Sequence, residues 1–230
     1  MTNNKLQNNI IIVAGGKGVR MGNNIPKQFL ILKDKPILMH TLERFHQFQT
    51  NLNIILVLPK DQQTLWSELC QTYNFKIPHT IVQGGKTRFH SVINGLSKIN
   101  NIKGITGVHD GVRPFVSIET IKQCFSTARN KGTAIPVVKL IDSIREINHT
   151  TSVAKSRINY RLVQTPQVFK TNILKEAYSQ KFNDEFTDDA SVIESAGYKV
   201  NLVEGNYENI KITSPLDMII AKALILDKEN

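Results

Sequence analysis

The chain has 230 residues, of which 40% are hydrophobic and 21% charged, a composition that suits one globular α/β domain over residues 1–230. No apolar stretch is long enough to span a membrane, so we expect no membrane partner, and the polar first nine residues show no secretion signal. We therefore expect a cytoplasmic protein in which Cys70 and Cys124 are buried thiols.

The net charge of +10 is compatible with nucleic-acid binding and equally with a basic cleft for small anions. No run of five or more Lys or Arg occurs, and no aromatic–basic interleaving or helix-turn-helix pattern is present. We therefore expect small anionic partners rather than nucleic acid, with the remaining charge on a solvated surface.

Short apolar runs alternate with helical patterns along the chain. Buried strands are predicted over residues 10–14, 53–58, 79–82, 105–108 and 133–138, and shorter ones over 28–32, 199–203 and 209–213. Helices are predicted from Ile37, from Thr171, after Arg88, and after the N-caps Asp61, Ser117, Thr187 and Ser214. The helix after Asp61 is expected to bury Leu65, Trp66, Leu69 and Tyr73, and Gly132 to end the helix that Ser117 caps. This alternation predicts a Rossmann-like, three-layer α/β/α fold with a twisted, mostly parallel sheet that binds ligands at the carboxyl ends of its strands.

A glycine-rich loop with two cations follows the first strand: Gly15, Gly16, Gly18, Arg20 and Lys27. Glycine lets the backbone turn sharply and bring its N–H groups close to a ligand. The pattern G-x-G-x-R-x(5)-P-K is not the dinucleotide fingerprint, because Met21 replaces the third glycine, and not a P-loop, because Asn23 follows Gly22. It predicts a cradle for a polyphosphate, with an ordinary glycine-rich βα turn as the alternative.

Two further loops follow later strands at the same edge of the predicted sheet. Gly84 and Gly85 begin a second glycine loop, and residues 109–114 read His-Asp-Gly-Val-Arg-Pro. Asp110 lies just past a strand end, where it is either a ligand for a hard cation or a turn-capping aspartate. No His or Cys cluster indicates zinc.

Residues 139–161 interrupt the alternation of strands and helices. Residues 142–147 alternate polar and apolar, and 148–151 give a turn, which predicts a protruding β-hairpin arm. The arm has little apolar surface to fold on by itself, so we expect it to serve dimerisation by packing on a second subunit.

Seven stretches stand in one order: residues 14–21, 26–28, Gly84-Gly85-x-x-Arg88-x-x-Ser91, 109–114, Thr165-Pro166-Gln167, 187–191 and 208–213. Together they resemble the 2-C-methyl-D-erythritol 4-phosphate cytidylyltransferases, the IspD family of the non-mevalonate isoprenoid pathway. The resemblance implies a fold of the nucleotide-diphospho-sugar transferase type. It also implies transfer of CMP from CTP to 2-C-methyl-D-erythritol 4-phosphate with release of pyrophosphate.

The residue types suit this chemistry. The attacking phosphate oxygen is already ionised at neutral pH, so the reaction needs positive charge along the triphosphate and no general base or nucleophilic side chain. The resemblance assigns Lys27 and Lys211 to the α-phosphate and Arg20 to the departing phosphates, and makes these three the catalytic residues. It also makes Asp110 the carboxylate for Mg²⁺.

The remaining site residues are implied by the same resemblance. The nucleotide-binding residues are Ala14, Gly15, Gly16, Gly18, Gly85, Ser91, Asp110 and Gly111, while Arg88 is expected to buttress its loop and His109 to be a packed or orienting residue. The substrate-binding residues are Arg113, Ser143, Arg157, Thr165 and Thr187. Because Ser143 and Arg157 lie on the arm, the resemblance implies a homodimer in which each arm reaches the partner's site. The arm departs most from the family, since residues 137–143 are longer than its common Pro-Val-x-Asp-Thr and Ser143 replaces the threonine.

Three alternatives remain open on the sequence. The first is a cytidylyltransferase for another polyol phosphate, such as ribitol 5-phosphate, which would share the nucleotide loops and differ at the arm and acceptor pocket. The second is a nucleic-acid-binding module, suggested by the charge. The third is a non-catalytic sensor, against which the joint presence of Arg20, Lys27, Asp110 and Lys211 argues.

Overall fold

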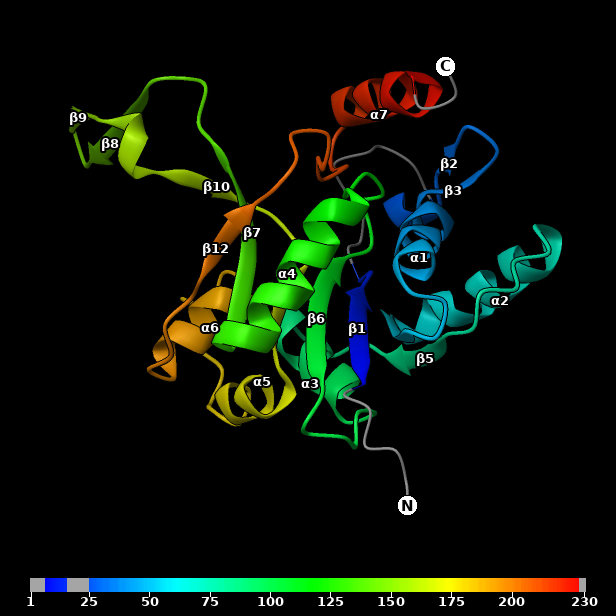
Figure 1. Ribbon diagram of the computed structural model, residues 1–230. Coiled ribbons are helices and arrows are strands. Elements are labelled where there is room, and N and C mark those ends of the chain that lie inside the picture. Colours follow the sequence, from blue (N-terminus) through cyan, green and yellow to red (C-terminus); the bar gives the residue numbers. More distant parts are fainter. Residues whose placement is uncertain (1–6, 16–24, 228–230) are drawn as a thin grey trace.

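The computed structural model describes residues 7–15 and 25–227 (Figure 1). Within these residues an eight-stranded sheet has the order β10-β7-β11-β6-β1-β4-β5, and β12 pairs with β7. The strands of this sheet are β1 (Asn8–Val13), β4 (Asn53–Leu58), β5 (Thr80–Gln83), β6 (Ile105–Asp110), β7 (Thr133–Lys139), β10 (Arg161–Val163), β11 (Gln167–Lys170) and β12 (Leu202–Glu204). β1 is parallel to β4 and β6, β4 to β5 and β7 to β12, whereas β10 and β11 run antiparallel to their neighbours. The mixed, mostly parallel sheet confirms the predicted fold class.

Helices cover both faces of this sheet. They are α1 (Ile37–Phe48), α2 (Gln63–Thr72), α3 (Arg88–Leu96), α4 (Ile118–Lys131), α5 (Thr171–Ala177), α6 (Asp189–Ser195) and α7 (Pro215–Asp227), with short 3-10 turns η2 (Lys27–Phe29), η3 (Lys60–Gln62) and η4 (Arg157–Asn159). Ile10 and Ile12 of β1 pack into one core with α1, α2 and α4, whereas Ile11 packs into the other with α3, α5 and α6. Because successive strand side chains point to opposite faces, a continuous apolar run supplies both cores.

A third, smaller core lies under α7, next to the hairpin of β2 (Ile31–Leu32) and β3 (Lys35–Pro36). Ser214 begins α7 as predicted, because its Oγ accepts a hydrogen bond from the Asp217 amide at 3.3 Å. The Asp217 carboxylate in turn accepts from the Ser214 amide at 2.8 Å. Among the helices of the described residues, none is long and apolar enough to cross a membrane.

Some local predictions in the first half of the chain are wrong. The stretch 28–32 begins as the 3-10 turn η2, because the Phe29 amide bonds back to the Pro26 carbonyl at 2.9 Å, and only its end is a strand. Asp61 lies in η3 and does not cap α2. Of the four residues expected on the inner face of α2, Trp66 is fully buried, whereas Leu65 and Tyr73 are exposed.

Caps and short strands in the second half fit the predictions in part. Ser117 caps α4 and Gly132 ends it at a φ of 95°, as predicted. The N-cap of α6 is Asp188 and not Thr187, because the Asp188 side chain and Ser191 form a capping box. The stretch 209–213 is not a strand: its Asn209 is buried and donates to the Thr165 carbonyl at 2.9 Å instead of joining the sheet.

The two cysteines differ in burial. Cys124 is buried as predicted, and Cys70 is half-buried, with burial raising its thiol pKa to about 11. Both thiols are free.

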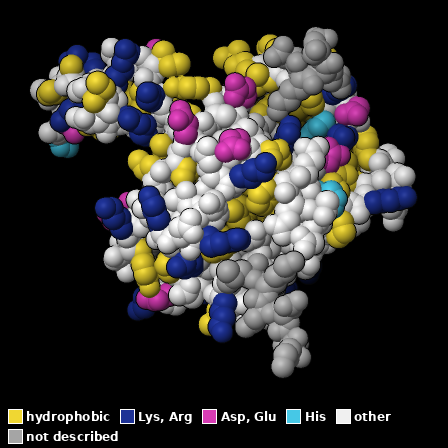
Figure 2. All heavy atoms as spheres, in the orientation of Figure 1, with side chains coloured by type: hydrophobic (Ala, Val, Ile, Leu, Met, Phe, Trp, Pro, Cys, Tyr) yellow, Lys and Arg dark blue, Asp and Glu magenta, His cyan; other side chains and the backbone are white. Residues whose placement is uncertain are grey.

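The predicted arm is an antiparallel hairpin of β8 (Ile144–Asn148) and β9 (Thr151–Lys155) that stands away from the rest of the chain (Figure 1). His149, at a φ of 48°, lies in its turn. Apolar side chains along the arm are exposed, among them Ile141 at 71%, Ile147 at 69% and Ile158 at 77%. Figure 2 shows the arm as a separate lobe with apolar and basic side chains next to one another.

Candidate active site

A cavity of about 450 Å³ lies at the carboxyl ends of β1, β4, β5 and β6. Ligands of parallel α/β sheets bind at this edge. The lining includes seven of the residues predicted for the site: Ala14, Gly15, Lys27, Gly85, Ser91, Asp110 and Lys211. Gly16, Gly18 and Arg20 lie outside the described residues. Gln28, Lys60, Lys86 and Arg88 also line the cavity.

The second glycine loop is held against the start of α3. Thr87 is the N-cap of α3, and the Ser91 hydroxyl donates to the Thr87 carbonyl at 2.9 Å and accepts from the Gly85 amide at 3.0 Å. A Cβ on Gly85 would lie 2.4 Å from the Cβ of His90, so this position requires glycine. Ser91 therefore sets the shape of the loop that lines the cavity.

Gly111 lets the end of β6 approach the end of β1. A Cβ at this position would lie 2.8 Å from the Cβ of Ala14 and 3.0 Å from Cδ1 of Leu38. Its own amide donates to the Val13 carbonyl at 2.9 Å. The glycine thus brings the aspartate loop against the end of β1.

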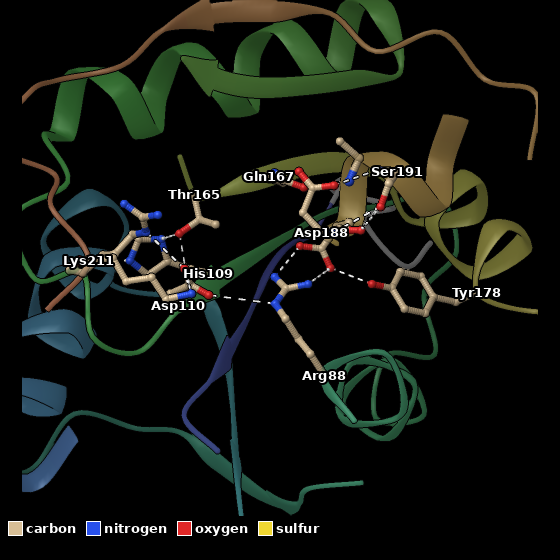
Figure 3. Close-up of polar contacts among 12 residues, drawn as sticks. Arg88, His109, Asp110, Thr165, Gln167, Tyr178, Asp188, Ser191 and Lys211 are labelled. Atoms are coloured by element: carbon tan, nitrogen blue, oxygen red, sulfur yellow. Dashed lines mark hydrogen bonds and ion pairs between the residues drawn. The ribbon is translucent and has the colours of Figure 1, made fainter. Parts of the chain in front are cut away.

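Asp110 is the buried carboxylate of the cavity, and three cations surround it (Figure 3). Its Oδ2 lies 3.1 Å from Nε of Arg113 and 3.1 Å from Nζ of Lys211, and its Oδ1 lies 3.9 Å from Nε of Arg88. Burial by itself raises the pKa of Asp110, but the three cations outweigh it and hold that pKa well below the usual range. Asp110 is therefore ionised at neutral pH.

His109 and Thr165 orient the backbone at Asp110. The Thr165 hydroxyl accepts from the Asp110 amide at 3.2 Å and donates to Nδ1 of His109 at 3.0 Å. Nε2 of His109 donates to the Arg113 carbonyl at 3.0 Å, which fixes the neutral tautomer. Burial lowers the pKa of His109 to about 4, in keeping with a neutral ring. His109 is thus packed and orienting, as predicted.

The predicted acceptor-side residues divide into two groups. Arg113 and Thr165 contact Asp110 directly. Ser143 and Arg157 are exposed residues of the arm, where an Arg157 Nη contacts the Ile141 carbonyl. Thr187 is exposed just before α6. The structure therefore places Arg113 and Thr165 next to Asp110 and leaves Ser143 and Arg157 on the arm.

Two residues near the cavity have roles that the sequence did not indicate. Gln28 is fully buried, and its Nε2 donates to the Ala14 carbonyl at 2.8 Å, whereas the sequence shows it only as the last residue of the Pro26-Lys27-Gln28 motif. Arg88 reaches across to the buried Asp189, with its Nη1 2.8 Å from Oδ1 and its Nη2 2.6 Å from Oδ2. Asp189 follows the cap residue in a helix-start pattern, so the sequence alone indicated only a cap.

A family profile decides which proteins this chain is related to. The profile described as IspD, 2-C-methyl-D-erythritol 4-phosphate cytidylyltransferase, matches residues 9–227. The chain belongs to the IspD family. Membership confirms the resemblance that the seven sequence stretches indicated.

IspD relatives with the name 2-C-methyl-D-erythritol 4-phosphate cytidylyltransferase match almost the whole chain. The protein of Bacteroides fragilis is 55% identical over 94% of this chain and 98% of its own length. That of Phocaeicola vulgatus is 53% identical over 96% of this chain and 100% of its own length.

Solved IspD structures share the fold. The 4-diphosphocytidyl-2C-methyl-D-erythritol synthase of Anaerococcus prevotii superimposes with a TM-score of 0.82 at 28% identity, covering 96% of both chains. The 2-C-methyl-D-erythritol 4-phosphate cytidylyltransferase of Thermus thermophilus gives 0.77 at 29% identity, covering 95% of this chain and 98% of its own.

Proposed function

We propose that this IspD chain transfers CMP from CTP to 2-C-methyl-D-erythritol 4-phosphate, giving 4-diphosphocytidyl-2-C-methyl-D-erythritol and pyrophosphate. The observation that carries the proposal is the cavity in which Lys27, Lys211 and Asp110 meet the two glycine loops. Relatives more than half identical over nearly the full chain bear the name of this activity.

The residues of the cavity suit an in-line displacement at phosphorus. An oxygen of the acceptor phosphate forms a bond to the α-phosphorus of CTP, and the bond from that phosphorus to the bridging oxygen of the β-phosphate breaks, so pyrophosphate leaves with the bonding electrons. Lys27 and Lys211 stabilise the negative charge that develops on the α-phosphate, and Arg20 stabilises the departing phosphates. No proton has to be removed from the attacking oxygen, so no side chain is needed as a base.

Asp110 fits a Mg²⁺ ion that arrives with the nucleotide. Mg²⁺ binds one or two carboxylates together with phosphate oxygens and water, and Asp110 is an ionised carboxylate in the cavity. Among the described residues no group of three or more His, Cys, Asp or Glu forms a metal cage. When bound, the ion would neutralise part of the charge on the triphosphate. Because Arg88, Arg113 and Lys211 surround the carboxylate, we expect the ion to need the phosphates as ligands.

The acceptor site would be completed by a second subunit. Arg113 and Thr165 contact Asp110, whereas Ser143 and Arg157 lie on the arm with its exposed apolar side chains. We propose a homodimer in which the arm of one subunit brings Ser143 and Arg157 to the acceptor phosphate in the site of the other. Thr187 would contact the polyol of the acceptor. We also propose a cytoplasmic location, where the two free thiols would stay reduced.

One assay tests the substrate pair. Pyrophosphate release from CTP is measured with 2-C-methyl-D-erythritol 4-phosphate and, in parallel, with ribitol 5-phosphate. High turnover with 2-C-methyl-D-erythritol 4-phosphate and little with ribitol 5-phosphate supports the proposal. The reverse result would make ribitol 5-phosphate the acceptor. If neither acceptor reacts and DNA binds with an affinity that falls steeply with salt, the result supports the alternative hypothesis of a nucleic-acid-binding module.

A further inference from the structure

We propose that Asp189 is a positioning residue of the nucleotide site that acts through Arg88. It keeps the Arg88 guanidinium beside Asp110 without letting it close onto the Asp110 carboxylate. The inference rests on the proposed function in that the cavity is taken to bind CTP. Figure 3 shows the Arg88 guanidinium directed toward Asp110 on one side. The guanidinium also binds Asp189 through both of its Nη atoms.

Asp189 is a fully buried carboxylate with three strong hydrogen bonds. Arg88 donates two of them through Nη1 at 2.8 Å and Nη2 at 2.6 Å, and the Tyr178 hydroxyl donates the third at 2.6 Å. Burial and the neighbouring Asp189 raise the pKa of Tyr178 well above its usual value, so the hydroxyl keeps its proton and donates. This bidentate geometry fixes the plane of the guanidinium.

Because its plane is fixed, the guanidinium of Arg88 turns its Nε edge toward the nucleotide site. Both Nη atoms are bound by Asp189, and Nε faces Oδ1 of Asp110 at 3.9 Å, beyond hydrogen-bonding distance. The other oxygen of Asp110 is shared by Arg113 and Lys211. Arg88 thus places a positive charge near Oδ1 without a hydrogen bond to it.

Loss of the Asp189 charge would release the Nη atoms. A guanidinium prefers a bidentate carboxylate partner, and Asp110 is the carboxylate within reach. Arg88 would then turn onto Asp110, compete with Lys211 for it and move into the cavity that both residues line. The expected result is weaker binding of CTP.

Asp189 is not needed to begin α6. The Asp188 side chain already accepts from the Ser191 amide at 2.9 Å, and Gln167 Oε1 accepts from the Ala190 amide at 2.7 Å. A buried ion pair adds little net stability compared with a well-packed apolar pair. The helix start is therefore held by other groups, and the Asp189 carboxylate serves Arg88 and Tyr178.

The test compares Asp189→Asn with Tyr178→Phe as a matched control. Both variants alter the same buried cluster, but Tyr178→Phe removes only the Tyr178 hydrogen bond and leaves the bidentate pair with Arg88 intact. The Kd of CTP is measured by calorimetry with Mg²⁺ and no acceptor, together with the melting temperature. Asp189→Asn should raise the Kd roughly ten- to a hundredfold, the range found when outer-sphere partners of metal ligands are removed. Tyr178→Phe should lower the melting temperature and leave the Kd unchanged.

A double-mutant cycle tests whether Asp189 acts through Arg88. In an Arg88→Ala background, Asp189→Asn should not raise the Kd further, and it should raise the melting temperature because it removes an unpaired buried charge. If Asp189→Asn does not fold, Arg88→Lys, which keeps the charge without the bidentate geometry, should show the increased Kd.

Three results would overturn the inference: a wild-type Kd in folded Asp189→Asn, equal increases in Kd for Asp189→Asn and Tyr178→Phe, or additive effects in the cycle. In the fallback, a wild-type Kd in Arg88→Lys would do the same. Wild-type protein that binds CTP but releases no pyrophosphate with the proposed acceptor would contradict the proposed function. The Kd values of the variants could still be compared, because they are measured without an acceptor.

Discussion

Lys211 Nζ lies 3.1 Å from Oδ2 of Asp110, so a side chain from the loop before α7 meets the carboxylate at the end of β6. The two residues have different proposed partners, the α-phosphate for Lys211 and Mg²⁺ for Asp110. If the proposed assignments hold, we expect binding of the nucleotide to loosen this ion pair. In this structure, the pair holds the lysine at the cavity.

Removal of either lysine should abolish most turnover without unfolding the protein. Lys27→Ala and Lys211→Ala each remove a charge assigned to the α-phosphate, where negative charge grows in the transition state, at a cost of about 3 kcal/mol in activation free energy. Single-turnover rates at saturating CTP measure this loss. The exposed Lys122 on α4, replaced by alanine, is the matched control. A rate near wild type for Lys27→Ala or Lys211→Ala would show that the assignment is wrong.

Asp110→Asn should lower activity and raise the Mg²⁺ concentration needed for it. The amide keeps the size of the side chain and loses the charge that attracts the ion. In calorimetry, wild-type protein should take up Mg²⁺ together with CTP and not without it, because three cations surround the carboxylate. An unchanged Mg²⁺ titration of activity in Asp110→Asn would mean that the metal lies elsewhere.

Two inactive variants should complement each other if the sites are shared between subunits. Lys27→Ala affects the cavity and Arg157→Ala affects the arm, so a mixed dimer has one site with both defects and one with neither. After subunit exchange at equal amounts, activity should return to roughly a quarter of wild type for random pairing.

The same mixture has a clear negative outcome. If each subunit uses its own Arg157, every site keeps one defect and no activity returns. A monomer in sedimentation at the assay concentration would also contradict the dimer. A normal KM for the acceptor in Arg157→Ala alone would show that Arg157 is a solvated arm residue.

Acidification should destabilise the protein in part through His79. Nε2 of His79 accepts from the Trp66 indole N–H at 2.9 Å, and Nδ1 donates to the Ile77 carbonyl at 2.8 Å, so the ring is neutral. Burial lowers the pKa of His79 below its value in the unfolded chain. The unfolded state therefore binds the proton first, and stability is lost as the pH falls from about 6.5, the unfolded value, toward the folded pKa.

Urea unfolding at pH 7.5 and 5.5, followed by the fluorescence of the single tryptophan, measures this loss. His79→Gln keeps an acceptor for Trp66 without titrating, so it should lose less stability than wild type over the same interval. Equal losses would show that His79 does not contribute.

Sequence patterns alone predict most of the local elements and the residue types of the site. The run at Ile10 to Ile12 predicted a buried strand, because side chains that alternate between two cores must all be apolar. Glycine loops and the Asp110 stretch followed strand ends, so their place at one edge of the sheet could be predicted. Ser117, Gly132 and Ser214 marked helix ends through hydrogen bonds to near neighbours.

The pairing of groups that are distant in the chain is visible only in the folded protein. Arg88 and Asp189 stand far apart in the chain, and no local pattern tells that the arginine bonds Asp189 in preference to Asp110. Asn209 is not in a strand, contrary to the prediction, and its side chain donates to the Thr165 carbonyl. The choice between the two carboxylates depends on strand order and packing, since both Asp110 and Asp189 are buried and an unpaired buried charge is costly. Hydrogen bonds between near neighbours can be predicted from local sequence patterns. The pairing of buried charges follows from the packing of the whole chain.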